Sequence, residues 1–203
     1  NAGKLMDDIY PHLSSFDLPK MESIDHIVWD TIDIAFCCLP HSTSHQIISK
    51  IPETVKIIDL SADFRFSNIK LYEETYNCEH SAPELQRKAV YGLSEIFRDD
   101  IKKARLVACP GCYPTSVIVP LYPLIEAKLI DPSHIIVDSK SGISGAGRKT
   151  TQASLFAEVN DGMKAYGIST HRHAPEMENI LSRANTEDVP YVQFVPQIAP
   201  MNR

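Results

Sequence analysis

Two cysteines three positions apart mark the part of this sequence with the clearest chemical potential. The segment VACPGCYPT holds Cys109 and Cys112 and runs directly into an apolar, periodic stretch that predicts a helix. A helix start offers unpaired N–H groups and the positive end of the helix dipole, and both favour a thiolate. Cys112 is therefore a candidate nucleophile, and Gly111 lets the backbone turn sharply and leaves room for a substrate beside the sulfur.

Three other interpretations of these cysteines stay open. Cys112 also fits a small buried hydrophobe, which is what most cysteines are. The Cys-x-x-Cys spacing matches a redox dithiol, although that motif normally has its first cysteine at the helix start and Cys109 ends a strand. A zinc knuckle would need two further ligands, and the sequence has no second Cys-x-x-Cys motif.

A second cluster combines two histidines with an arginine. The segment GISTHRHAPEMENIL places His171, Arg172 and His173 just before Pro175, where a helix is expected to start. Imidazole and guanidinium groups at such a turn would supply a general base and an anion clamp. The alternatives are exposed polar turn residues, or a metal-binding pair that lacks a third ligand.

The third cluster is a glycine-rich loop over residues 139–151, SKSGISGAGRKTT. It resembles the phosphate-binding pattern G-x-x-x-x-G-K-[ST], but Arg148 stands between Gly147 and Lys149, so the register fails by one residue. The pattern therefore argues against a nucleoside triphosphatase. A glycine loop with exposed N–H groups and nearby basic residues still suits a phosphate or nicotinamide-side contact, and a flexible surface loop is the alternative.

Two short apolar runs, residues 33–40 and 55–64, predict the strands that position the first part of a site. The segment between them has helical spacing, so the three elements predict a βαβ crossover and a parallel sheet buried on both faces. Ligands of such sheets bind at the carboxyl ends of the strands. Here those ends are Leu39-Pro40-His41 and the segment that begins at Ser61.

The remaining pattern divides the chain in two. Residues 65–98 are expected to be polar and irregular, and residues 105–110 predict another strand. The helix after Cys112 contains Pro120 and Pro123, which should kink or interrupt it. After residues 131–132 the pattern becomes α+β, with strands over 133–144 and 189–200 and a mixed or antiparallel sheet. This change of pattern predicts a domain boundary near residues 110–135.

Composition limits the classes of partner. The 203 residues are 43% hydrophobic, enough for one good core or two small ones, and the net charge of −6 argues against nucleic acid or an anionic membrane. No apolar run approaches the ~20 residues that span a bilayer. Five cysteines without framework spacing predict free thiols in a cytosolic or organellar-stromal compartment. The chain starts without Met and is expected to be a piece of a longer protein.

Taken together, several segments resemble N-acetyl-γ-glutamyl-phosphate reductase, the arginine-pathway relative of aspartate-semialdehyde dehydrogenase. They occur in the order of that family across nearly the whole chain. The matching segments are LPHSTS, VKIIDLSADFR, APEL, AVYGLSE, PGCYPT, IIVDSKSGISGAGRK, HRHAPE and PMNR.

The resemblance implies an α/β fold in two parts: a partial Rossmann-type NADP-binding domain over 1–111 and a partial α+β catalytic and dimerisation domain with a mixed sheet over 112–203. It implies NADPH-dependent reduction of N-acetyl-γ-glutamyl phosphate, a small acyl phosphate, to the semialdehyde. Phosphate release through a cysteine thioester is part of that reaction, which belongs to arginine biosynthesis. A cytoplasmic homo-oligomer, either dimer or tetramer, is also expected.

Carried over residue by residue, the resemblance makes Cys112 the nucleophile and His173 the acid/base, with His171 the second choice. No metal is expected. NADP(H) would contact the two strand ends, the loop that resembles the family's cofactor-facing loop, and the segment that approaches the nicotinamide: Leu39, Pro40, His41, Ser61, Ser141, Gly142 and Asn202. The candidates for binding the departing phosphate are Arg148, Lys149 and Arg172.

Two departures from the family pattern stand out. The residue before Pro-Gly-Cys is usually Asn and is Cys109 here. The glycine-rich turn that should open the Rossmann-type domain is missing, as are the elements after residue 203. Three alternatives therefore remain: a related acyl-phosphate or semialdehyde dehydrogenase, a non-catalytic fragment acting in binding or assembly, and a cysteine hydrolase built on Cys112 and His173.

Overall fold

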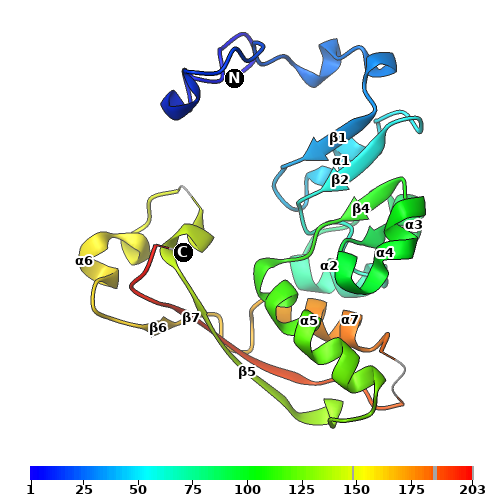
Figure 1. Cartoon of the computed structure of the whole chain (residues 1–203), viewed down its shortest axis with the longest axis vertical. Helices are drawn as coiled ribbons and strands as arrows, with labels where there is room; N and C mark the ends of the chain where they lie inside the picture. The colour runs from blue at the N-terminus through cyan, green and yellow to red at the C-terminus, as the bar shows by residue number, and fades with distance from the viewer. Residues whose placement is uncertain (148, 185–186, 203) are drawn as a thin grey trace.

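Two sheets organise the computed structural model, which describes residues 1–147, 149–184 and 187–202 (Figure 1). The first sheet has the strand order β1-β2-β4-β3, and all of its pairings are parallel. Residues 1–33 form 3₁₀ turns and loops that extend away from this sheet. The strands of the sheet are β1 (Ile34–Cys37), β2 (Lys56–Asp59), β3 (Val90–Tyr91) and β4 (Leu106–Ala108).

The predicted βαβ crossover is confirmed, but the predicted burial of the sheet on both faces is wrong for β1, where Phe36 is 67% exposed. Helix α1 (Ser44–Ile48) joins β1 to β2, and Ile34 and Cys37 lie opposite Lys56 and Asp59 in the parallel register. Because the two strands end level with each other, the loops that follow them lie at the same edge of the sheet. Apolar side chains of α1 and β2 pack together in one core cluster. Ile48, Val55 and Ile57 are fully buried there.

The expectation of an irregular segment over residues 65–98 is wrong. This part of the chain contains α2 (Ile69–Tyr76), α3 (Pro83–Lys88), strand β3 and the start of α4 (Ser94–Lys103). The Asn68 side chain accepts a hydrogen bond from the backbone N–H of Lys70 and so caps α2. Tyr72 is fully buried on this helix. The polar composition hid these helices, which bury few residues each: Tyr72 on α2, Gln86 on α3 and none on α4.

Helix α5 (Cys112–Glu126) continues through both prolines, so the prediction that they kink or interrupt it is wrong as regards an interruption. Each proline removes a single hydrogen bond from the helical ladder. Burial of the apolar face compensates for that loss, because Ile118 and Ile125 on α5 are 0% and 2% exposed.

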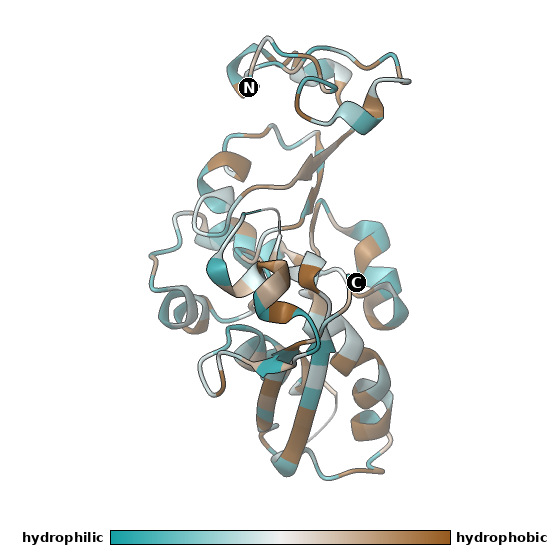
Figure 2. Ribbon diagram, turned by 90° about the vertical axis from the view of Figure 1, so that its left-hand side faces the viewer, coloured by the Kyte–Doolittle hydropathy of each residue, from teal (hydrophilic) through white to brown (hydrophobic). Residues whose placement is uncertain are grey.

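The second sheet is mixed, as predicted. Strands β5 (Ile135–Ser141) and β7 (Val192–Ile198) are parallel, and β6 (Lys164–Ala165) pairs antiparallel with β7. Figure 2 shows that the two long strands, β5 and β7, are hydrophobic where β5 begins. They become more hydrophilic towards the end of β5. A short helix, α6 (Phe156–Val159), lies in the connection between β5 and β6.

Helices α5 and α7 (His173–Leu181) pack against each other and share a core with the second sheet. Tyr91 and Leu93, which belong to the first sheet and the loop after it, are 2% exposed within the same core. The two sheets are thus joined by apolar packing beside the starts of both helices. No helix in the part of the chain that the structure describes is long and apolar enough to cross a bilayer.

Candidate active site

A cleft of about 510 Å³ lies between the carboxyl ends of β1 and β2 and the starts of α5 and α7. It brings together most of the side chains that the sequence singled out, from segments more than 100 residues apart. Their roles remain predictions, and their surroundings decide what they can do. Those lining the cleft are Leu39, Pro40, His41, Ser61, Cys112, Ser141, His171, Arg172 and His173.

Cys112 is the first residue of α5, and its side chain is exposed. The N–H groups of Cys112 and Tyr113 have no partner in the helix, because the first turn of any helix leaves them free. They are free hydrogen-bond donors at the same end of the helix as the sulfur, and such donors can stabilise an oxyanion formed on a carbonyl that the sulfur attacks.

The glycine before the nucleophile is needed for a different reason from the one expected. Gly111 has φ −65° and ψ 156°, an extended conformation that any residue adopts. A Cβ added there would lie 2.6 Å from His173 Nε2 and 2.9 Å from His173 Cε1. The room expected for a substrate is therefore occupied by the imidazole, and glycine is required because His173 packs directly against the backbone.

His173 is a neutral imidazole at neutral pH. Burial lowers its pKa to about 3, with further contributions from His171, Arg65 and Arg172. Its Nε2 edge faces Gly111, and its buried Nδ1 has no hydrogen-bond partner within the described residues. A neutral ring beside the turn before Cys112 has a free lone pair for a proton, and its low pKa means that a proton it accepts is readily given up again.

His171 has a different position and orients its neighbour. Its Nδ1 accepts a hydrogen bond of 3.1 Å from the backbone N–H of His173, so Nε2 carries the proton of the neutral ring. The ring lies edge-on to Tyr113, Tyr166 and Phe194. Burial, followed by the charge of Arg172, lowers the pKa of His171.

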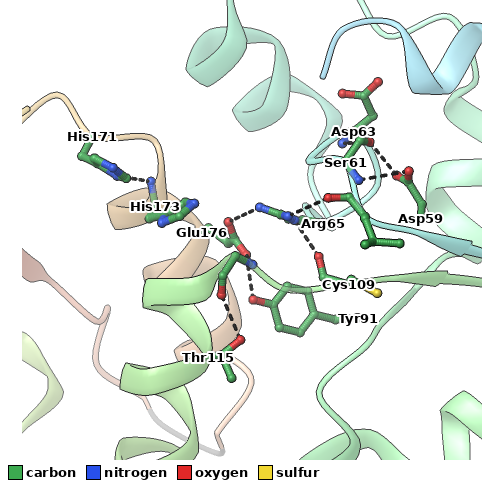
Figure 3. A network of polar contacts seen from close by, with 12 residues as sticks. Asp59, Ser61, Asp63, Arg65, Tyr91, Cys109, Thr115, His171, His173 and Glu176 are labelled. Atoms are coloured by element: carbon green, nitrogen blue, oxygen red, sulfur yellow. Dashed lines mark hydrogen bonds and ion pairs between the residues drawn. The ribbon is translucent and has the colours of Figure 1, made fainter. Parts of the chain in front are cut away.

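The carboxylate of Glu176 holds the turn before Cys112 in place (Figure 3). Glu176 is 1% exposed, and its Oε1 accepts hydrogen bonds from the backbone N–H of Gly111 at 2.9 Å and from the hydroxyl of Tyr91 at 2.8 Å. Its Oε2 lies 3.2 Å from the Arg65 guanidinium. Arg65 in turn donates from Nε to the carbonyl oxygen of Cys109 at 2.7 Å.

This network couples the turn before Cys112 to the helix that carries His173. Glu176 follows His173 by almost one helical turn on α7, so one rigid helix fixes both the imidazole and the Gly111 turn. The sequence patterns assigned no site role to either Glu176 or Arg65. One sequence signal could have identified Glu176. It is a carboxylate beside the apolar residues of α7, and a carboxylate that is buried there needs a hydrogen-bond donor or a positive charge as a partner.

Two further buried carboxylates shape the opposite wall of the cleft. Ser61 donates its hydroxyl proton to Asp59 at 2.6 Å and accepts the backbone N–H of Asp63 at 3.1 Å (Figure 3). Asp63 accepts the backbone N–H groups of Ser42 and His45. Burial raises the pKa of Asp59. Ser61 thus lines the cleft, but its proton is committed to the protein.

The other predicted site residues are less close to the cysteine. Gly142 adjoins the cleft through Ser141 but does not line it. Asn202 lines a separate hollow of about 240 Å³ beside Ile143. Lys149 lines neither space, and Arg148 lies outside the described residues.

Comparison with known proteins places both halves of the chain in one family. Residues 1–104 match the family model described as semialdehyde dehydrogenase, NAD binding domain, and residues 112–203 match semialdehyde dehydrogenase, dimerisation domain. A probable chloroplastic N-acetyl-gamma-glutamyl-phosphate reductase of Arabidopsis thaliana is 50% identical over 202 residues, covering 100% of this chain and 50% of that protein. The reductase of Rhodospirillum rubrum is 49% identical over 207 residues, covering 100% of this chain and 58% of that protein.

Solved structures share the fold at low sequence identity. Aspartate semialdehyde dehydrogenase II from Vibrio cholerae superposes with a TM-score of 0.61 at 13% identity, over 90% of this chain and 56% of that one. Aspartate semialdehyde dehydrogenase with NADP from Candida albicans gives 0.52 at 13% identity, over 84% of this chain and 48% of that one. The chain spans 48% to 59% of the length of the curated relatives it matches.

Gly111→Ala tests the contact between the nucleophile's turn and the imidazole. The added methyl group would lie 2.6 Å from His173 Nε2, so the buried ring or the turn has to move. We expect the free energy of unfolding, measured by urea denaturation, to fall by about 1–3 kcal/mol. Gly162→Ala is the control, because the nearest atom to its added Cβ is 4.0 Å away. Equal stability of the two variants would contradict the close contact.

Glu176→Gln tests the buried ion pair. The substitution keeps the size of the side chain but leaves the Arg65 guanidinium in the interior without its counter-charge. We expect the free energy of unfolding at pH 7 to fall by about 3 kcal/mol. Glu84→Gln breaks the exposed ion pair with Arg87. It should change the free energy of unfolding by less than about 1 kcal/mol. A similarly small effect of Glu176→Gln would show that the pair does not organise the site.

Proposed function

Because the chain belongs to the semialdehyde dehydrogenase family, we propose that it carries the active-site half of an N-acetyl-γ-glutamyl-phosphate reductase. The proposed reaction converts the acyl phosphate to the semialdehyde with release of phosphate. The observation that carries the proposal is the packing of the His173 imidazole against Gly111, directly before the exposed Cys112. The substrate class is supported by the names of relatives about 50% identical over the whole chain.

In this mechanism the Cys112 sulfur attacks the carbonyl carbon of the acyl phosphate. The carbon–oxygen bond to phosphate breaks, phosphate leaves, and a thioester forms on Cys112. The free N–H groups of Cys112 and Tyr113 would donate to the carbonyl oxygen as it gains charge. The N–H of Gly111 cannot take part, because Glu176 already accepts it.

We propose NADP(H) as the cofactor. Leu39, Pro40, His41 and Ser61 would hold it, and they suit this role because they follow β1 and β2 at the edge where parallel sheets bind dinucleotides. When bound, the dinucleotide would supply the hydride that reduces the thioester. Ser141, Gly142 and Asn202 remain candidates for the nicotinamide side.

His173 would move the protons. Its neutral ring accepts the thiol proton of Cys112 when the sulfur attacks, which makes the ring an imidazolium. The imidazolium returns a proton to the alkoxide oxygen of the reduced, sulfur-bound intermediate. When the carbon–sulfur bond then breaks, the hydroxyl proton passes through His173 to the departing sulfur, and the semialdehyde leaves. Burial favours the neutral ring, so the proton is readily given back. His171 would orient His173 through the hydrogen bond that it accepts from the His173 backbone N–H.

The organisation of the protein is part of the same proposal. Residues 1–111 would belong to the NADP-binding domain, and residues 112–203 to the catalytic and dimerisation domain of a homodimer or homotetramer. The dimerisation-domain match supports an oligomer. A reducing compartment such as the cytoplasm suits the free cysteines, which include both Cys109 and Cys112.

Cys112→Ser in the full-length protein tests the nucleophile. A hydroxyl at this position is a far weaker nucleophile, so we expect kcat/KM to fall at least about 1,000-fold. The measurement is NADPH oxidation in the presence of the acyl phosphate. Cys109→Ser is the matched control and should keep activity within about threefold, because Cys109 contributes its backbone carbonyl to the network. Full activity of Cys112→Ser would exclude the thioester mechanism.

A further inference from the structure

Arg172 brings a positive charge to the cleft and has no carboxylate partner among the described residues. Its Nη1 lies 2.7 Å from His41 Nε2, and its Cζ lies 4.9 Å from the centre of the Tyr76 ring. The rings of His41 and Tyr76 also contact each other, with centroids 5.4 Å apart. The guanidinium is therefore held in place by two aromatic side chains from the first half of the chain.

Both supporting side chains are neutral. An arginine can only donate hydrogen bonds, so His41 Nε2 has to be an unprotonated acceptor. Burial, with the charge of Arg172, lowers the pKa of His41, and burial raises the pKa of Tyr76 to about 12. The support fixes the guanidinium and leaves its charge uncompensated.

The second arginine of the cleft has the opposite environment. Arg65 is paired with the buried Glu176, and it also donates to the carbonyl oxygens of Cys109 and Leu60. Its charge is paired, and three of its five N–H donors are used by the protein. The described residues that line the cleft include no aspartate or glutamate, so the charge of Arg172 is the one available to a ligand.

We propose that Arg172 binds the phosphate group of the acyl-phosphate substrate, and that His41 and Tyr76 are positioning residues that orient its guanidinium. The inference rests on the proposed function and extends it. One N–H of the planar guanidinium is used by His41, and the remaining donors can contact phosphate oxygens in a bidentate arrangement. Lys149, the other described candidate, does not line the cleft.

The test measures the reverse reaction of the full-length protein, in which inorganic phosphate is a substrate. Arg172→Gln should raise the KM for phosphate about 10- to 100-fold, with the KM for NADP⁺ and kcat changed less than about threefold. Arg172→Lys keeps the charge but not the planar guanidinium. Its KM for phosphate should lie between those of the wild type and Arg172→Gln. Arg87→Gln removes an exposed arginine outside the cleft and should leave all three constants unchanged.

The positioning role has its own readout. Tyr76→Leu removes the ring beneath the guanidinium and should raise the KM for phosphate about threefold or more at nearly constant kcat. Tyr76→Phe keeps the ring and should restore most of the lost affinity. A purely structural role would lower kcat and raise the KM values for phosphate and NADP⁺ together, without rescue by phenylalanine. That result would overturn the positioning role.

A second measurement does not depend on turnover. Inorganic phosphate should slow the alkylation of Cys112 by iodoacetamide in the wild type but not in Arg172→Gln, relative to chloride at equal ionic strength. If phosphate protects Cys112 of the wild type from alkylation but the protein has no reductase activity, the proposed function is refuted and the phosphate site is retained. Activity with protection independent of Arg172 would refute the site alone. A rise in the KM for NADP⁺ alone would assign Arg172 to the cofactor's phosphate and overturn the proposal.

Discussion

The buried carboxylate of Glu176 is the interaction on which the rest of the site depends. Transferring a carboxylate to the interior is costly unless its lone pairs find donors, and here three donors from separate segments meet it. Arg65 follows β2, Tyr91 lies on β3, and Gly111 precedes α5. The arrangement fixes the register of the two helices that carry the nucleophile and the imidazole, and it ties both to the first sheet.

The same carboxylate gives the two arginines in the cleft different roles. Glu176 neutralises Arg65, which becomes part of the framework, and it leaves Arg172 as the uncompensated cation. His41 supports Arg172 without a charge of its own. A cleft without carboxylates in its described lining therefore attracts an anion, and the guanidinium that would meet it is already oriented. Such preorganisation reduces the entropy lost when a phosphate binds.

Local sequence patterns predicted the elements but not the contacts between them. The βαβ crossover, the helix start at Cys112 and the mixed sheet follow from periodicity and from turn residues. The helices within 65–98 were missed because their apolar faces are narrow. The Arg65–Glu176 pair joins positions 111 residues apart, and no local pattern encodes such a partner. The need for glycine at 111 was predicted, but its cause became visible only with His173 in place.

The electrostatic state of the cleft follows from burial. His41, His171 and His173 all have pKa values lowered first by desolvation, and nearby arginine charges lower them further. Each ring is therefore neutral at neutral pH and available as a hydrogen-bond acceptor or a base. Protonation of any of them would add a second positive charge beside Arg172, at a cost that the arginine itself imposes. The cation that binds an anion thus also helps to keep the neighbouring rings unprotonated.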